Sequence, residues 1–75
     1  MKKVKFFEVN LQDSSDYIFV DEANRKYHLF NDARAHGIKN VTPDFWDKFF
    51  FCETIIIEFT DKNGKNIINK VVSYK

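Results

Sequence analysis

A single helix signal lies in the middle of a chain whose other segments are patterned as β-strands. Thr42, Pro43 and Asp44 supply a capping hydroxyl, a proline suited to the first helical position and a carboxylate near the positive end of the helix dipole. Aromatic residues follow at helical spacing, namely Phe45, Trp46, Phe49 and Phe50. The pattern predicts a short helix over residues 43–50 with one aromatic face.

Three strands are predicted before this helix. In the first, residues 4–11, the alternation of apolar and polar residues shifts by one place across Phe7-Glu8. Such a shift indicates a β-bulge, which bends a strand so that it can serve both halves of a small barrel. Residues 17–20 and 25–30 form a predicted hairpin with a four-residue connection, because the turn between them lacks glycine. A further helical turn is expected at residues 33–36, capped by Asp32 and ended by Gly37.

Two strands are predicted after the helix. Residues 53–60 alternate strongly, residues 61–65 form a hairpin loop that contains Asn63-Gly64, and residues 66–74 return. The predicted fold is therefore mainly β (α+β), a single small domain over residues 1–75 with the order β-β-β-α-β-β. This is the element order of the OB-fold, a five-stranded barrel of about this size. An SH3-like barrel, with a 3₁₀ turn in place of the helix, is the alternative.

Charge and cysteine content exclude several classes of protein. Twelve Lys and Arg against eleven Asp and Glu give a net charge of +1, which excludes the strongly basic balance of a duplex-binding domain. The single cysteine, Cys52, excludes an internal disulfide and a cysteine-rich zinc site, so a cytoplasmic protein is expected. The longest apolar run, residues 49–52, is four residues, whereas a membrane-spanning helix needs about 20. Lys5 and Glu8 interrupt any apolar region of a secretory signal.

No residue pattern indicates catalysis. His28 and His36 are eight residues apart on different predicted elements, a spacing that does not suggest a metal pair. Cys52 follows three phenylalanines, with no basic residue beside it to favour the thiolate. Asp44 and Asp47 are explained by capping and solvation of the helix. We therefore expect no enzyme activity, no cofactor and no metal.

A nucleic-acid face is one of two predicted binding surfaces. Single-strand binders combine aromatic rings that stack on bases with cations that follow the backbone, and OB-folds bind on their second and third strands. The candidate residues are Tyr17, Phe19, Arg25, Lys26, Tyr27, His28, Lys65 and Lys70. Two features weaken this hypothesis. Alternation requires one pair of β-strand residues, either Tyr17 and Phe19 or Ile18 and Val20, to lie in the core. The loop at residues 13–16 is acidic and would repel a polyanion.

A protein interface is the second predicted surface. Residues 49–57 are the most apolar stretch, and the strand there carries bulk on both faces. Its second face is expected to lie under the helix or, as the alternative, against a second subunit or another protein through Phe49, Phe51 and Ile56. The near-neutral charge favours a protein partner over nucleic acid, as in a small adaptor, regulator or inhibitor. The abundance of Lys, Asn, Ile and Phe is typical of AT-rich genomes and favours a bacterial or phage source.

Overall fold

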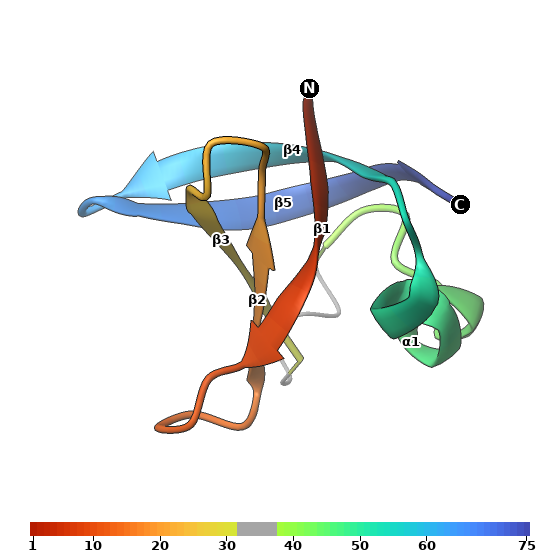
Figure 1. The fold of residues 1–75 in the computed structure, drawn as a ribbon, viewed down its shortest axis with the longest axis horizontal. Coiled ribbons are helices and arrows are strands. Elements are labelled where there is room, and N and C mark those ends of the chain that lie inside the picture. Colours follow the sequence, from red (N-terminus) through yellow and green to blue (C-terminus); the bar gives the residue numbers. More distant parts are fainter. Residues whose placement is uncertain (32–37) are drawn as a thin grey trace.

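The strands form a closed ring, and the short helical segment lies at one end of it (Figure 1). The computed structural model describes residues 1–31 and 38–75. The strands are β1 (Lys2–Val9), β2 (Asp16–Val20), β3 (Lys26–Phe30), β4 (Ile55–Lys62) and β5 (Lys65–Tyr74). The helix α1 (Pro43–Lys48) and the 3₁₀ turn η2 (Phe49–Phe51) lie between β3 and β4. The predicted β-β-β-α-β-β order is confirmed.

Strand pairing gives the ring the order β1-β2-β3-β5-β4, with β4 returning to β1. Four of the five contacts are antiparallel, and the contact between β3 and β5 is parallel. Together with a helix between the third and fourth strands, this is the OB-like arrangement. The α-helix stands where the SH3-like alternative required only a 3₁₀ turn.

The predicted bulge in β1 is confirmed. Phe6 pairs with Phe19 and Glu8 pairs with Ile18, so Phe7 has no counterpart on β2. The first residues of β1, 2–4, pair with β4, whereas residues 5–9 pair with β2. The bent strand thereby joins the two halves of the barrel, as such a bulge allows.

The helix starts as predicted and tightens before its predicted end. The Thr42 hydroxyl accepts a hydrogen bond from the Phe45 N–H at 3.2 Å, and Pro43 occupies the first turn. α1 ends at Lys48, and the chain then forms the 3₁₀ turn η2, closed by the Cys52 N–H to the Phe49 carbonyl at 3.4 Å. The α-helical part is therefore two residues shorter than predicted.

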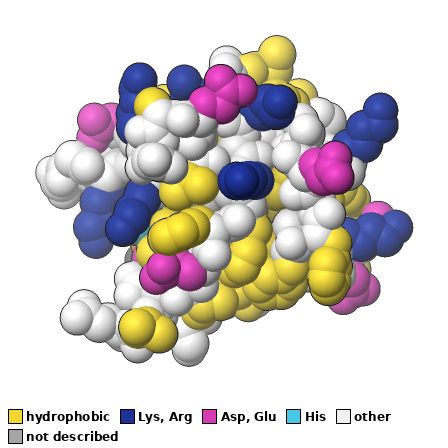
Figure 2. Space-filling view, in the orientation of Figure 1, with side chains coloured by type: hydrophobic (Ala, Val, Ile, Leu, Met, Phe, Trp, Pro, Cys, Tyr) yellow, Lys and Arg dark blue, Asp and Glu magenta, His cyan; other side chains and the backbone are white. Residues whose placement is uncertain are grey.

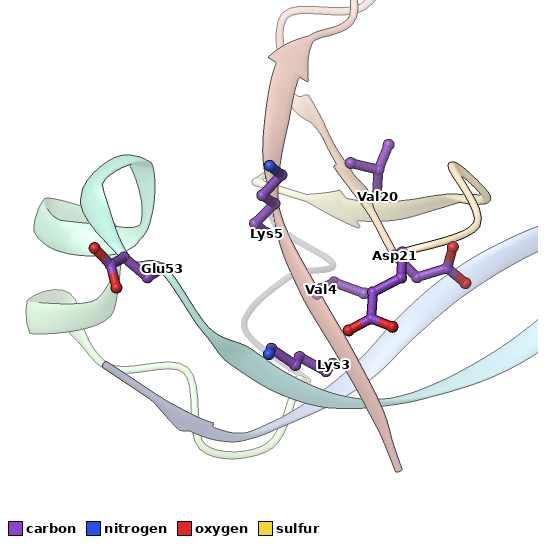
Figure 3. A pocket seen from close by; sticks show the side chains of 7 residues that line it. Lys3, Val4, Lys5, Val20, Asp21 and Glu53 are labelled. Carbon is purple, nitrogen blue, oxygen red and sulfur yellow. The ribbon is translucent and has the colours of Figure 1, made fainter.

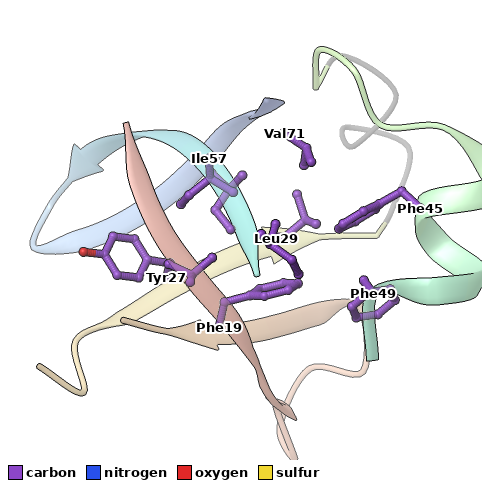
Figure 4. Packing of buried hydrophobic residues seen from close by; sticks show 10 residues of the cluster. Phe19, Tyr27, Leu29, Phe45, Phe49, Ile57 and Val71 are labelled. Atoms are coloured by element: carbon purple, nitrogen blue, oxygen red, sulfur yellow. The ribbon is translucent and has the colours of Figure 1, made fainter. Parts of the chain in front are cut away.

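The core fills the barrel and the space between the barrel and α1 (Figure 4). Ten buried residues form it, namely Val4, Phe19, Tyr27, Leu29, Phe45, Phe49, Ile55, Ile57, Ile68 and Val71. On β2 the inward pair is Tyr17 and Phe19, since Phe19 is in this cluster and Tyr17 packs against it. Ile18 and Val20 therefore lie on the outer face. No helix in the described ranges is long and apolar enough to span a membrane.

Both hairpin turns differ by a residue or more from their predicted lengths. The turn between β2 and β3 spans residues 21–25, one more than predicted, with Asn24 in the left-handed region at φ 62°. Between β4 and β5 only Asn63 and Gly64 remain outside the strands, at φ 54° and 83°, as a tight primed turn requires. The helical turn predicted at residues 33–36, with Asp32 and Gly37, lies outside the described residues, as does His36.

Candidate binding surfaces

Two phenylalanines of η2 are exposed and form what we call the aromatic end surface, Phe50 and Phe51. Phe51 is 84% exposed and Phe50 is 45% exposed. A 3₁₀ turn rotates each residue by about a third of a circle, so three consecutive rings cannot all face the barrel. Phe49 fills the core and the next two rings point elsewhere. Hydrophobic side chains also gather in the lower part of Figure 2, toward the side that carries α1 in Figure 1.

Phe50 is held in place by other rings. Its ring centroid lies 4.0 Å from that of Phe49 and 4.5 Å from that of Phe6. Tyr17 lies 6.1 Å away in an edge-on orientation. The position of Phe51 follows from the same turn, because the two residues are adjacent on η2. The fold thus fixes the ring of Phe50 and the backbone position of Phe51.

The three residues predicted for a protein interface lie in different environments. Phe49 is 1% exposed and belongs to the core, so that part of the prediction is wrong. Phe51 is exposed as an interface residue must be. Ile56 is half-buried on the outer face, between Lys3 on β1 and Ser73 on β5, and lies outside the core cluster. The expectation that α1 covers this outer face is therefore wrong. Phe50, which helical spacing places on the aromatic face of the helix, is 45% exposed, and its exposure was not predicted.

Strand pairing brings only part of the predicted basic stripe together. The parallel register pairs Tyr27 with Asn66, which places Lys26 beside Lys65 on the outer face. Arg25 lies in the turn after β2, with its Nε 3.8 Å from Asp21 Oδ2. Lys70 pairs with Glu58 farther along β5.

Lys5, which was not predicted, extends the basic group. It lies across Val20 from Lys26 in the ladder of β1, β2 and β3. We call Lys5, Lys26 and Lys65 the lysine row.

Most aromatic residues predicted for the nucleic-acid face point inward. Phe19 and Tyr27 are at most 1% exposed, which removes them from any binding face. Tyr17 packs against α1 and η2, with its ring centroid 5.6 Å from that of Trp46 and 4.9 Å from that of Phe49. His28 is on the outer face, and Phe30 stacks on it with ring centroids 6.2 Å apart and an interplanar angle of 14°. The outer face therefore carries one predicted ring, His28, whose side chain is only 13% exposed, and one ring that was not predicted, the half-buried Phe30.

A buried carboxylate anchors His28. Asp16 is 2% exposed, and the His28 Nδ1 lies 2.9 and 3.0 Å from its two oxygens. Because a carboxylate only accepts hydrogen bonds, this nitrogen is the donor. The Asn10 side-chain amide donates to the same carboxylate at 3.0 Å. The arrangement fixes the loop after β1 to the sheet. Within residues 1–31 and 38–75, no group of three or more His, Cys, Asp or Glu side chains is placed to hold a metal ion.

A second buried carboxylate, Asp21, lies at the end of the barrel opposite α1. The Tyr27 hydroxyl donates to Asp21 Oδ2 at 2.8 Å, and the Ala23 and Arg25 N–H groups donate to Oδ1. Burial raises the pKa of Asp21, but these hydrogen bonds and the Arg25 charge outweigh it, so the pKa lies below its ordinary value. Burial, together with the hydrogen bond to Asp21, raises the pKa of Tyr27 to about 12.

Two shallow hollows adjoin this carboxylate. One, of about 200 Å³, is lined by Lys3, Val4, Lys5, Val20, Asp21, Glu22 and Glu53 (Figure 3). The other, of about 350 Å³, is lined by Lys2, Lys3, Asp21, Glu22, Ala23 and Arg25. Both linings mix the two signs of charge, so neither hollow favours an anion or a cation.

Comparisons with protein families, with curated proteins and with solved structures find no match to this chain. The chemistry of the surfaces themselves therefore carries the functional argument.

Proposed function

We propose that this chain is a non-catalytic module that binds another protein through the aromatic end surface. The exposure of Phe51 on a closed turn is the observation that supports this proposal most directly. Burying a phenylalanine side chain fully contributes about 1.5–3 kcal/mol, and aromatic side chains supply much of the energy of protein interfaces. A partner with an apolar pocket of the size of a phenyl ring fits this surface.

The packing of Phe50 supports the same proposal. Phe50 is packed against Phe6 and Phe49, so few conformations are lost when a partner covers it. Pre-organised side chains of this kind reduce the entropy cost of binding. Exposed Asp47 and Lys48 lie on the preceding helix and can form a polar rim. A small adaptor, regulator or inhibitor in the cytoplasm is the role we infer.

Affinity capture with matched variants tests the proposal. The unmodified chain, Phe51→Asp and Leu11→Asp are each used as bait in a lysate of the source cells. Leu11 is 97% exposed in the loop after β1, so its variant makes the same chemical change away from the aromatic end surface. We expect a protein that is captured by the unmodified chain and by Leu11→Asp but lost with Phe51→Asp.

The captured protein is then purified and its dissociation constant is measured by calorimetry. Loss of Phe51 should weaken binding about 30-fold or more, which corresponds to about 2 kcal/mol. Equal binding of the Phe51→Asp variant, with unchanged circular dichroism, would show that the aromatic end surface is not the interface.

A second candidate function is binding of single-stranded nucleic acid along the lysine row. The supporting observation is that Lys5, Lys26 and Lys65 lie on one outer face that also carries the stacked rings of His28 and Phe30. Cations follow a phosphate backbone while rings stack on bases. Glu8 on β1 and the buried core rings oppose this function, so it ranks second.

Fluorescence anisotropy with labelled single-stranded DNA and RNA tests the second candidate. Three phosphate contacts predict a salt slope of about −2, so affinity should fall about 20-fold between roughly 50 and 200 mM salt. Replacing Lys26 and Lys65 by Glu should abolish binding, whereas the matched pair Lys48→Glu and Lys75→Glu, away from the lysine row, should retain part of it. Absence of binding at low salt would eliminate this function.

A further inference from the structure

Part of β4 has an unpaired edge. Residues 55–57 pair with β1 on one side and with β5 on the other. Residues 58–62 pair only with β5, and no strand among residues 1–31 and 38–75 lies on their other side. All five of these residues are exposed. In Figure 1 this part of the hairpin extends beyond the crossing with β1. An exposed edge of this kind presents backbone groups that can pair with another strand.

We propose that this edge pairs antiparallel with the same edge of a second copy, about a two-fold axis at Thr60. In an antiparallel ladder, alternate residues direct their backbone groups to opposite edges, and two opposed residues must both direct theirs toward the other strand or both direct theirs away from it. A two-fold axis through one residue places opposite each other residues that are an even number of positions apart, and such residues direct their backbone groups to the same edge. An axis through Thr60 does so for all five residues, which gives the self-complementary contact of a two-fold dimer.

Two of the three charged residues on this edge, Glu58 and Lys62, are complementary in that register, and the third, Asp61, lies opposite the partner subunit's Phe59. Glu58 lies opposite the partner subunit's Lys62, and the symmetry produces this pair twice. Within the described residues, neither side chain takes part in an ion pair of its own. Lys62 instead faces Lys65 across the hairpin. The second copy therefore supplies a carboxylate beside two lysines that otherwise repel each other.

Thr60 also fits the register, and Phe59 keeps the edge ordered within each subunit. Thr60 meets Thr60 of the partner subunit, a favourable cross-strand combination. Phe59 packs inward on Tyr27 with ring centroids 4.9 Å apart, which keeps this side of the edge ordered. Glu58 already faces Lys70 on β5, but a foreign strand without a carboxylate at the matching place would leave Lys62 facing only Lys65, so Lys62 favours a second copy over other partners.

The dimer is independent of the aromatic end surface, which lies on η2, before β4 begins. Its contact is five residues long on each side, so we expect a weak association with a dissociation constant of roughly 10 μM to 1 mM. Failure of this inference would leave the proposed function unaffected, because the two use different residues.

Sedimentation equilibrium on charge-swapped variants tests the register. Glu58→Lys and Lys62→Glu should each weaken the dimer about tenfold, because each turns two attractions into two repulsions. The double variant should restore the affinity to within about threefold. Asp47→Lys on α1, with the same change in charge as Glu58→Lys, should leave it unchanged. A monomer at all concentrations up to about 1 mM, or a dimer that is indifferent to the swaps, would overturn the proposal.

Cross-linking gives a second readout that does not depend on charge. Opposed side chains in an antiparallel pair have Cβ atoms about 4.5–5.5 Å apart, close enough for a disulfide after small shifts. Thr60→Cys in a Cys52→Ser background should therefore form a covalent dimer under mild oxidation. Ser73→Cys, exposed on β5, is the matched control and should not. Equal cross-linking of both would contradict the two-fold register.

Discussion

Replacing His28 by Ala tests whether its contact with Asp16 stabilises the fold. The imidazole is the only described partner of Asp16 Oδ1, at 3.0 Å, whereas Oδ2 also receives the Asn10 amide. Asp16 is 2% exposed, so a carboxylate that loses this partner cannot rotate freely into water. Such an unsatisfied buried group costs about 1–3 kcal/mol.

The loss of the ring adds to this cost. His28 stacks on Phe30, and aromatic pairs contribute about 0.5–1.5 kcal/mol. We therefore expect His28→Ala to destabilise the protein by about 3 kcal/mol. A chain of this length has a total stability of only about 4–11 kcal/mol. The melting temperature should fall by about 12–24 °C, at about 4–8 °C per kcal/mol.

Urea unfolding at pH 7, followed by circular dichroism and the fluorescence of Trp46, measures the effect. A double-mutant cycle with Asp16→Ala then separates the pair from its surroundings. Removing both partners abolishes the unpaired carboxylate, so the double variant should be more stable than the sum of the single effects by about 1–2 kcal/mol. Additivity within about 0.4 kcal/mol would refute a stabilising contact between the two side chains.

Three further predictions concern the core, a turn and the far end of the barrel. Phe45→Ala should cost about 3–5 kcal/mol in urea unfolding, because Phe45 is fully buried, and a cost below about 1 kcal/mol would contradict its place in the core. Gly64→Ala should cost about 1 kcal/mol from backbone strain alone, since Gly64 has φ 83° and open space around it; an unchanged urea midpoint would argue against this turn. Tyr27 has a pKa of about 12 in the fold against 10.0 ordinarily, so its contribution is complete below pH 10 and is lost as the pH rises toward 12. Thermal melts between pH 8 and pH 12 should show that loss, and Tyr27→Phe should lack it.

The parts of the fold that depend on local signals were predicted from the sequence. Thr42 and Pro43 mark the start of α1, Asn63-Gly64 marks the last turn, and the shift at Phe7-Glu8 marks the bulge. Each signal involves residues within a few positions of one another. The element order, and with it the OB-like class, follows from these signals.

The composition of the surfaces depends on contacts between distant segments and was predicted only in part. The turn after β2 has five residues, and this length determines that Val20 pairs with Lys26 and that Asp16 comes within reach of His28. The turn sequence does not specify its length. The inward orientation of Tyr17 depends on α1 packing against it, a contact that alternation within one strand does not reveal.

The exposure of Phe50 was not predicted, for a related reason. Helical periodicity predicts that Phe49 and Phe50 share one face with Phe45. The chain tightens to a 3₁₀ turn at Phe49, and this changes the direction of each ring after it. Three identical residues in a row give no signal of where such a change begins.

The short parallel contact between β3 and β5 has a consequence for how the protein folds. Only two residue pairs form it, Tyr27 with Asn66 and His28 with Ile67, with one added bond from the Asn66 amide to the Lys26 carbonyl. Otherwise, within the described part of the chain, β3 pairs only with β2, and β5 pairs only with β4 and, through a single bridge at Lys70, with Lys39. The antiparallel pairs of consecutive strands, β1–β2–β3 and β4–β5, can thus form within microseconds, whereas the contact between β3 and β5 must close a loop of about forty residues.

We therefore expect ring closure to be the slow step of folding and the same junction to open first in the native state. Native-state hydrogen exchange measures this directly. Amide hydrogens that bridge β3 and β5 should exchange before those between β2 and β3. The closed barrel would then open and close as two units, the β1–β2–β3 sheet and the β4–β5 hairpin. The rate of opening would be determined by the two-residue contact between β3 and β5, the shortest ladder in the ring.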